Sequence, residues 1–304
     1  MSLFLWIPLL VPAACAAAAA TRRQAPWTRP LGLASALVIL VTGLGLLGSI
    51  TAAGGEALTA AGDLFRVDAL AAYLLMTIGA VATVALWADL SVPAEPDGWF
   101  TALVCAFLAA MTLAVLADNL GVLWVAIEAT TITTAFLVGY RSGRRSLEAA
   151  WKYVVLGSVG VAIAFLGIVV LYAATRSAGH PTLSWVELVR LAPQLDPAVT
   201  RLGIALATLG FATKAGLAPM HSWLPDAHSQ APAPVSGLMS GVLLSVALYA
   251  VLRLRTISDL ALGPGFMRGL LLVLGVLSLL VAATLTLTQR DYKRLLAYSS
   301  IEHM

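Results

Sequence analysis

The sequence predicts an all-α protein, a polytopic membrane helix bundle whose seventh helix is broken. Hydrophobic residues make up 60% of the 304-residue chain and charged residues only 11%, whereas a soluble domain carries about 25% charged residues. Apolar runs of roughly 20 residues, enough to span a bilayer as a helix, recur along the whole chain. One of these runs contains a lysine, a glycine and a proline close together.

Nine complete spans are expected, and a tenth begins near Leu295. The nine lie at 2–20, 31–53, 67–88, 99–117, 119–140, 149–174, 201–222, 233–255 and 267–288. These spans leave nothing over for a soluble domain. The net charge of +3 is too small to indicate a nucleic-acid partner.

Loop charges predict the orientation. One side carries ten basic residues: Arg22, Arg23, Arg29, Arg141, Arg144, Arg145, Lys152, Arg290, Lys293 and Arg294. The other side carries seven: Arg66, Arg176, Arg190, Arg201, Arg253, Arg255 and Arg268. Because cytoplasmic loops are enriched in lysine and arginine, we expect the first set in the cytoplasm and the N-terminus outside.

Several familiar motifs are absent or uninformative. Cys15 and Cys105 lie in different apolar runs and have no nearby histidine or second cysteine, so packing is expected and a metal site is not. The glycines of "GLGLLG" at 43–48 have no strand before them, so they indicate close helix packing and not a dinucleotide site. Gly237 and Gly241 are interpreted in the same way. No resident cofactor is expected.

Three ionisable residues need an explanation because charges inside a membrane are costly and typically face a bundle interior or a wet cavity. Glu128 lies near the middle of its span, Lys214 in the seventh span and Lys152 near the start of the sixth. Lys152 has a simple alternative, a helical pair with Glu148 and a side chain that reaches the basic side. Glu128 and Lys214 are interpreted as a proton-switching pair that face each other near mid-membrane; the alternative is a purely structural pair.

The helix break supports this interpretation. Pro219 removes a helix hydrogen bond to Ala215, and Gly216 eases the bend. Irregular backbone at membrane depth is tolerated where it is buried in protein or lines a water-filled cavity. Lys214, just before the break, is therefore expected where water reaches it.

The histidines near the break are further candidates. Histidine titrates near neutrality, so His221 and His228 can pass protons between bulk water and Lys214; the alternative is that they cap and pack the connection. For His228 the packing interpretation is favoured. His180 is expected to be solvated in the long 175–200 connection.

The sequence resembles a known family at these residues. "KAGLAPMHSWLPDAHSQAPAPVSGLMSGVLLSVALYAVLR", "ADNLGVLWVAIEATTITTAFLVGYR", "SLEAAWKYVVLGSVGVAIAFLG" and "RDYKRLLAYSSIEHM" resemble the proton-conducting antiporter-like subunits of complex I, of multisubunit sodium/proton antiporters and of hydrogenase membrane arms, and most of all hydrogenase-4 component F. The resemblance implies relay roles for Glu128, Lys214, Lys152 and His303. It also implies the first half of an inverted-repeat fold.

Two departures from the family pattern qualify the relay. Ser245 stands where many members carry a lysine in the eighth helix; a serine can hold a water but cannot carry charge. Family members also continue through a second helix set beyond "SSIEHM". We therefore expect a fragment of a longer protein that does not pump alone.

The predicted organisation has three parts, namely N-terminal helices at 1–90, a first antiporter-like set with a half-channel at 99–255, and the start of a second set at 267–304. The predicted function is proton translocation by a subunit of a redox-driven complex in the cell inner membrane. Its partners would be other membrane subunits, lipid, protons and possibly sodium. The alternatives are a non-conducting scaffold, a sodium/proton antiporter subunit and an inorganic-carbon uptake subunit.

Overall fold

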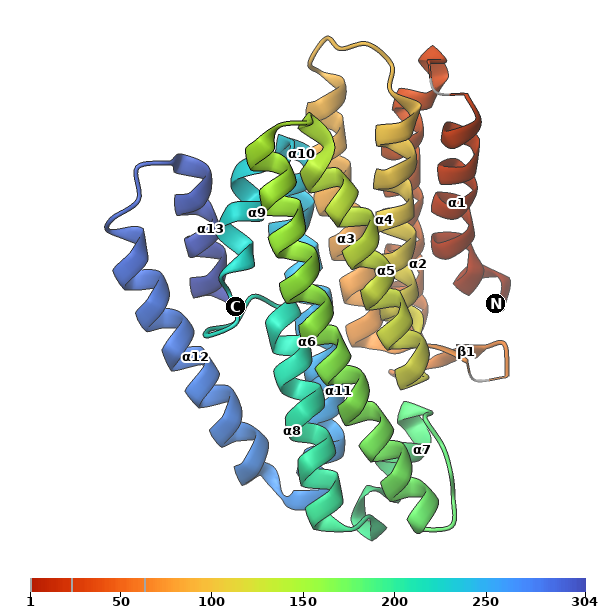
Figure 1. Cartoon of the computed structure of the whole chain (residues 1–304). Helices are drawn as coiled ribbons and strands as arrows, with labels where there is room; N and C mark the ends of the chain where they lie inside the picture. Colours follow the sequence, from red (N-terminus) through yellow and green to blue (C-terminus); the bar gives the residue numbers. More distant parts are fainter. Residues whose placement is uncertain (1, 23, 63) are drawn as a thin grey trace.

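The computed structural model describes residues 2–22, 24–62 and 64–304 and shows a helix bundle (Figure 1). Arg23, one of the charges used to predict the orientation, lies outside the described residues. The long helices are α1 (Ser2–Thr21), α2 (Arg29–Ala52), α3 (Ala69–Leu90), α4 (Gly98–Leu116), α5 (Leu120–Val138), α6 (Arg144–Ser177), α8 (Pro197–Lys214), α11 (Leu244–Leu262) and α12 (Pro264–Thr286). The shorter helices are α7 (Trp185–Leu191), α9 (Trp223–Gln230), α10 (Ala233–Leu238) and α13 (Tyr292–His303).

Eight helices in the described part of the chain are long and apolar enough to cross a membrane. They correspond to every predicted complete span except 201–222. That span is divided between α8, which ends at Lys214, and α9, which begins at Trp223. The break in the seventh span is thus confirmed.

The bundle has two distinct ends (Figure 1). The hairpin end holds α7 and the strands β1 (Leu58–Ala60) and β2 (Phe65–Val67), which pair antiparallel with Leu58 opposite Val67. The basic end holds the connections at 22–28, 139–143 and 287–291. All three basic loops therefore share one end, as the charge pattern predicts.

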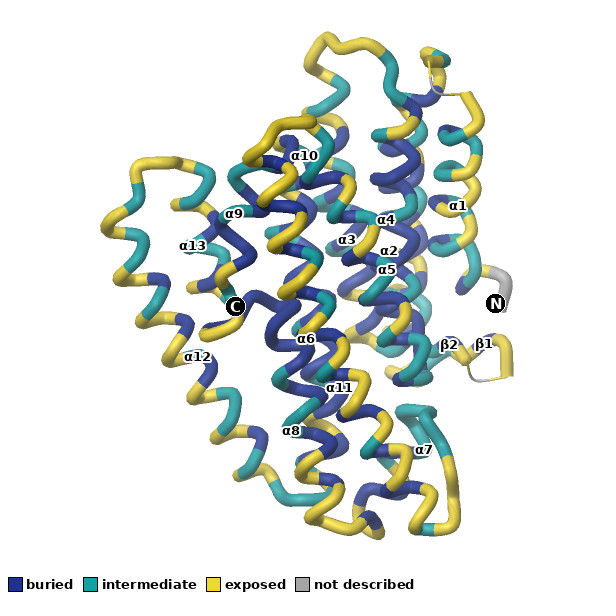
Figure 2. Tube along the Cα trace, in the orientation of Figure 1, coloured by how far each residue is buried: buried dark blue, intermediate teal, exposed yellow. Residues whose placement is uncertain are grey.

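Helix α4 is enclosed by neighbouring helices, whereas α12 lies at the margin of the bundle (Figure 2). In α4, 72% of the membrane-spanning window is buried, against 17% in α12. Helices α6 and α8 approach closely because Gly210 has no side chain; a Cβ there would lie 2.4 Å from the backbone nitrogen of Ala164. Small residues at a helix crossing are the usual device for close packing in membranes.

The close helix packing predicted for the "GLGLLG" glycines is present at only one of the three positions. Gly43 packs against α3, where a Cβ would lie 2.6 Å from the Met76 nitrogen. Gly45 and Gly48 have nothing within 4 Å, so the packing interpretation is wrong for them. Gly241 does pack on α3, against Val81.

Gly216, and not Pro219, ends α8. Gly216 has φ +75°, and its N–H donates to the carbonyl of Thr213 while the N–H of Leu217 donates to the carbonyl of Ala212. This is the Schellman arrangement, which satisfies the last carbonyls of a helix. The expected loss of a hydrogen bond at Pro219 is therefore wrong, because the helix has already stopped at Lys214.

The segment after the break is held by side chains. Trp223 Nε1 donates to the carbonyl of Thr213 at 2.9 Å, and the N–H of Ala218 donates to Ser278 Oγ on α12 at 2.9 Å. Because no water is available in a hydrocarbon core, such partners are required for exposed peptide groups. Side chains from within and beyond the segment therefore satisfy these two backbone groups of the break.

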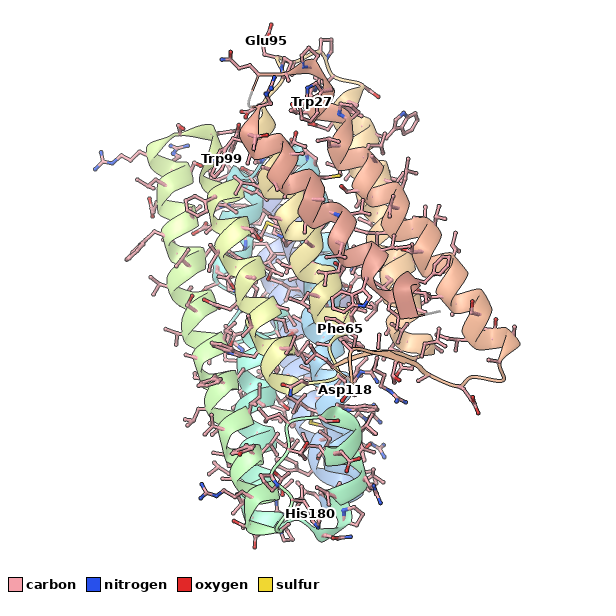
Figure 3. All side chains as sticks on the ribbon, turned by 90° about the vertical axis from the view of Figure 1, so that its right-hand side faces the viewer. Trp27, Phe65, Glu95, Trp99, Asp118 and His180 are labelled. Atoms are coloured by element: carbon pink, nitrogen blue, oxygen red, sulfur yellow. The ribbon has the colours of Figure 1, made fainter. Side chains whose placement is uncertain are left out.

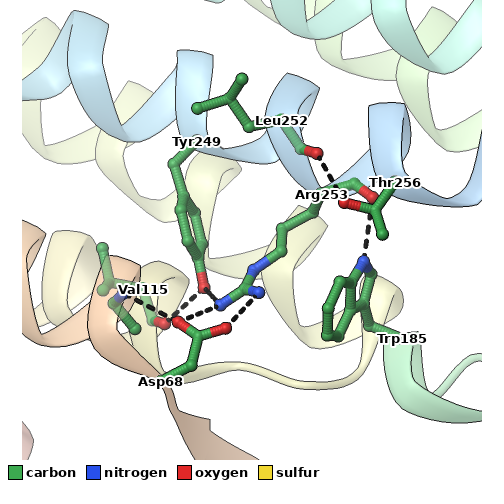
Figure 4. Close-up of polar contacts among 8 residues, drawn as sticks. Asp68, Val115, Trp185, Tyr249, Leu252, Arg253 and Thr256 are labelled. Carbon is green, nitrogen blue, oxygen red and sulfur yellow. Dashed lines mark hydrogen bonds and ion pairs between the residues drawn. The ribbon is translucent and has the colours of Figure 1, made fainter. Parts of the chain in front are cut away.

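An ion pair ties α11 to the start of α3 near the hairpin end (Figure 4). Arg253 Nη1 and Nη2 donate to Asp68 Oδ2 and Oδ1 at 2.5 and 2.9 Å, and Nη2 also donates to the Tyr249 hydroxyl at 2.7 Å. Tyr249 donates to the carbonyl of Val115 on α4, and Trp185 of α7 stacks on the guanidinium. The pair therefore joins four helices.

Arg253, counted above among the basic residues of this side of the membrane, lies within α11 and is buried. Its residue exposure is only 7%. Burial acts to raise the pKa of Asp68, but the Arg253 hydrogen bonds and charge outweigh it and hold the pKa below the ordinary 3.8. Asp68 also caps α3 by accepting from the N–H of Ala71.

We expect Gly216→Ala to lower the free energy of unfolding by about 1–2 kcal/mol, because a left-handed conformation is strained for a residue with a Cβ. That Cβ would also lie 2.4 Å from Leu224 Cδ1. Thermal unfolding in detergent measures the effect. Gly45→Ala is the matched control and should leave stability unchanged or raise it. Equal stability of the Gly216→Ala variant would contradict this account of the break.

We expect Arg253→Met to destabilise the protein by about 3–5 kcal/mol, because removal of one member of a buried ion pair leaves the other charge uncompensated. Asp68→Asn keeps the helix cap and removes the charge. The double variant should therefore be more stable than Arg253→Met alone, as measured by denaturation in detergent.

The same pair gives a pH dependence. Because the folded pKa of Asp68 is lowered, its contribution is complete above the ordinary value of 3.8 and is lost as the pH falls below it. Asp68→Asn should remove this part of the acid sensitivity. An unchanged acid profile in that variant would show that the pair does not contribute.

Candidate functional site

Lys214, the last residue of α8, is completely buried. Its Nζ donates to the hydroxyl of Tyr153 at 2.5 Å and to Thr131 Oγ1 at 2.9 Å. The ammonium also lies 4.4 Å from the centre of the Tyr153 ring. Its described partners are thus two neutral hydroxyls and an aromatic face, contributed by α5 and α6.

Glu128 is half-buried between α5 and α6. Its Oε1 accepts from Ser158 Oγ at 2.9 Å, and its Oε2 accepts from Thr131 Oγ1 at 3.3 Å. The sequence predicts that Glu128 and Lys214 face each other directly. Within the described part of the chain no ion pair joins them; Thr131 instead contacts both.

Thr131 therefore completes a hydrogen-bonded chain from Lys214 Nζ through Thr131 Oγ1 to Glu128 Oε2; the carbonyl of Ile127, also at 3.3 Å, is the alternative acceptor for its hydroxyl proton. A threonine hydroxyl can accept one hydrogen bond while it donates another. In the sequence Thr131 lies three residues after Glu128, close enough on a helix to reach its carboxylate, but nothing there connects it with Lys214. Tyr153 and Ser158 give no signal of their own, because they lie on a separate helix among apolar residues.

Lys152 lies away from Lys214, at the basic end. Its Nζ is 2.8 Å from Glu148 Oε1 and 3.2 Å from Asp226 Oδ2, and its side chain is 46% exposed. The predicted helical pair with Glu148 is thus present. Asp226 of α9 also accepts from Arg294 of α13. Asp226, which the sequence reasoning missed, joins three helices immediately after the break.

The other predicted relay residues are spread over the basic half. His228 is 4% exposed, and its Nε2 has no hydrogen-bond partner among the described residues. His228 and His303 line the same cavity of about 550 Å³. His221 is half-buried, and its Nδ1 likewise has no described partner. Ser245 is half-buried on α11, with no hydrogen bond of its hydroxyl among the described contacts.

A π-helical turn, Met239–Leu243, borders the cavity that holds His228 and His303. Within this turn Ser240 Oγ lies 2.6 Å from Ser300 Oγ of α13. Such turns occur mostly as single insertions in α-helices, frequently at functional sites. The spacing of apolar residues does not reveal the turn, so the sequence predicts an uninterrupted helix here.

The described residues hold no group of three or more histidine, cysteine, aspartate or glutamate side chains arranged for a metal ion. Cys105 is buried and 3.6 Å from Ser35 Oγ, and Cys15 is half-buried.

Comparisons with known proteins identify the family. Residues 117–304 match the family described as NADH:quinone oxidoreductase/Mrp antiporter, transmembrane. A hydrogenase-4 component F homologue of Methylacidiphilum infernorum is 43% identical over 66% of this chain and 42% of its own length. NADH-quinone oxidoreductase subunit N of Desulforudis audaxviator is 31% identical over 97% of this chain and 60% of its own length.

Solved structures show the same fold. A chain of respiratory complex I from Thermus thermophilus matches 99% of this chain with a TM-score of 0.75 and 27% identity. A chain of the archaeal membrane-bound sulfane sulfur reductase matches 98% with a TM-score of 0.88 and 24% identity. In both cases the present chain covers 62% of the other.

The chain thus spans about half the length of the curated relatives it matches. Those relatives are subunits of multisubunit membrane complexes. The resemblance seen in the sequence is confirmed: this multi-pass membrane protein belongs to the NADH:quinone oxidoreductase/Mrp antiporter transmembrane family.

Proposed function

We propose that the chain carries a proton-translocating half-channel of an antiporter-like subunit, driven by a redox complex of the hydrogenase or NADH-quinone oxidoreductase type in the cell inner membrane. The observation that supports this most is the chain of hydrogen bonds from Lys214 through Thr131 to Glu128. It places a basic and an acidic group inside the bundle, separated by one hydroxyl.

The geometry suits a proton transfer in which the threonine only relays. The Lys214 ammonium gives a proton to Thr131 Oγ1 as the Thr131 hydroxyl proton passes to the Glu128 carboxylate. The amine becomes neutral and the carboxyl becomes protonated, so charge and protons balance. The reverse transfer restores the pair. The Thr131 hydroxyl is neutral before and after the transfer. A change in the charge of Lys214 is therefore matched by a change in the charge of Glu128.

The surroundings of Lys214 favour a switch over a fixed ion pair. A buried cation stabilised by a carboxylate in direct contact is costly to separate, whereas Lys214 is held by hydroxyls and a Tyr153 ring. Its position at the end of α8 also places it beside the break. A conformational change in the segment that follows the break would therefore alter the contacts of Lys214 directly.

Access from the basic end is proposed through the histidine-lined region. His228 and His303 share a cavity there, and His221 lies in the connection between α8 and α9. Lys152 and Asp226 anchor α9 to α6 close by. In this role Lys152 positions the broken segment and need not itself carry the proton.

A non-conducting scaffold is the second candidate, favoured by one observation. Ser245 provides no charged group on α11 to continue the relay from Lys214. Sodium/proton antiport and inorganic-carbon uptake are further alternatives within the same family of functions. All of these imply other membrane subunits as partners.

Transport measurements distinguish the proton-translocating subunit from the non-conducting scaffold. In the assembled complex, Lys214→Ala should abolish proton translocation, and Thr131→Val should reduce it by at least tenfold because valine cannot relay a proton. Thr130→Val is the matched control: Thr130 is buried on the same helix, but its hydroxyl donates to the carbonyl of Ile127 and does not contact Lys214. Assembly is checked by the amount of each variant in the membrane. Unchanged pumping in Lys214→Ala would establish the scaffold.

Topology gives an independent test of the orientation. In a variant without native cysteines, a cysteine introduced by Ser142→Cys at the basic end should resist a membrane-impermeant thiol reagent in intact cells. One introduced by Ser177→Cys at the opposite end should react. Both serines are exposed, so access depends on the side of the membrane. The opposite labelling pattern would reverse the predicted orientation of the chain in the membrane.

A further inference from the structure

A polar cavity of about 790 Å³ opens at the hairpin end, remote from the histidine-lined region. Its walls come from the β1–β2 hairpin, the turn between α4 and α5, and the segment that leads into α7. Asp118 lies in that turn, beside the hairpin residue Phe65 (Figure 3). The residues used below that line the cavity are Arg66, Asp118, Ser184 and Glu187.

The backbone of Asp118 is fixed by hydrogen bonds, but one of its carboxylate oxygens lacks a well-formed hydrogen bond within the described part of the chain. Its residue exposure is 3%. Its N–H donates to the carbonyl of Leu64 at 3.0 Å, and its carbonyl accepts from the N–H of Trp185 at 2.9 Å. In the side chain, Oδ2 accepts from Ser184 Oγ at 2.5 Å, whereas Oδ1 is buried and makes no well-formed hydrogen bond to the described residues; the N–H of Val186 is the nearest backbone donor acting on this carboxyl. A buried polar atom of this kind is uncommon and calls for an explanation.

Asp68, the nearby carboxyl, makes the contrast plain. Both of its oxygens accept from Arg253, and Oδ1 also accepts from the N–H of Ala71 (Figure 4). Its charge is therefore fully paired. The two aspartates belong to one polar region, but only Asp118 retains a free oxygen beside an open cavity.

We propose that Asp118 is a proton-exchanging carboxyl that takes up and releases protons through the hairpin-end cavity, while Asp68 remains a fixed charge. When Asp118 is protonated, its carboxyl is neutral and the buried Oδ1 no longer bears charge. When it is ionised, Ser184 holds the charge on Oδ2. The proton is exchanged with water, and no other bond changes.

The charges around Asp118 are consistent with this role. Arg66 of β2 and Arg253 of α11 favour its ionised form, and Glu187 of α7 lines the same cavity. Asp68 and Tyr249 are the other titratable groups nearby; Asp63, which precedes β2 in the sequence, lies outside the described residues. Burial is the largest influence and raises the pKa of Asp118, although the Ser184 hydrogen bond, Arg66, the Val186 N–H and Arg253 partly offset it.

A place in transport follows if the proposed function holds. Helix α11 carries Ser245, Tyr249 and Arg253 four residues apart, and so on one face. That polar stripe covers about 12 Å of the helix axis and ends at the Arg253–Asp68 pair. Asp118 would then be the exchangeable group at the hairpin end. The exchange itself does not require that the chain pump protons.

Carbodiimide labelling tests the exchange without any transport assay, because carbodiimides react with protonated carboxyl groups. The purified chain in detergent is treated with a water-soluble carbodiimide and glycine ethyl ester at pH values from 4 to 8, and the modified residues are located by mass spectrometry. We expect Asp118 to be labelled to a higher pH than the exposed Glu56, and Asp68 to remain unlabelled. Ser184→Ala and Arg66→Gln should each move the Asp118 profile to higher pH.

Arg176→Gln is the matched control, because Arg176 is exposed in the last turn of α6 and does not line the cavity. It should leave the profile unchanged. Labelling of Asp118 no greater than that of Asp68 at every pH would overturn the proposal. Protection of Asp118 by sodium at constant ionic strength would also overturn it, since the carboxyl would then be a cation ligand. If Asp118 exchanges but Lys214→Ala still pumps, the proposed function fails and this inference stands.

Discussion

The burial of the Lys214 amine among neutral groups is the constraint on which the rest of the structure depends. A charged side chain at membrane depth is costly, and this one contacts Tyr153 and Thr131 instead of a carboxylate. The end of α8 must therefore be fixed closely enough to keep both contacts. The Schellman arrangement at Gly216 and the close crossing at Gly210 together provide that precision.

The two ends of the bundle stabilise their charges differently. At the basic end, Asp226 shares Lys152 and Arg294 in a partly exposed network, and exposed ion pairs of this kind contribute little to stability. At the hairpin end, Asp68 and Arg253 form a buried two-point pair. The bundle is thus tied rigidly at one end and more loosely at the other, where the broken helix ends. The segment that follows the break therefore lies at the more loosely tied end.

Much of the fold was predictable from the sequence, because length and apolarity alone identify a membrane span. The break was predictable from Lys214, Gly216 and Pro219, although the sequence could not show which residue ends the helix, since that depends on the backbone conformation. Glu128 and Lys214 stood out because charge is rare in such segments. Thr131, Asp118 and the Asp68–Arg253 pair did not, since their roles arise from contacts between distant helices. The spacing of apolar residues likewise gave no sign of the π-helical turn at Met239–Leu243.

The most direct measurement of the central claim is ¹⁵N NMR of the lysine side chains in the purified chain. The lysines of the sequence are Lys152, Lys214 and Lys293, so the Lys214 Nζ signal is assigned by its loss in Lys214→Ala. If Thr131 couples the amine to Glu128, both Glu128→Gln and Thr131→Val will shift the Lys214 signal and leave those of Lys152 and Lys293 in place, whereas Thr130→Val will shift none of them. A Lys214 signal that is the same in wild type, Glu128→Gln and Thr131→Val would contradict the account.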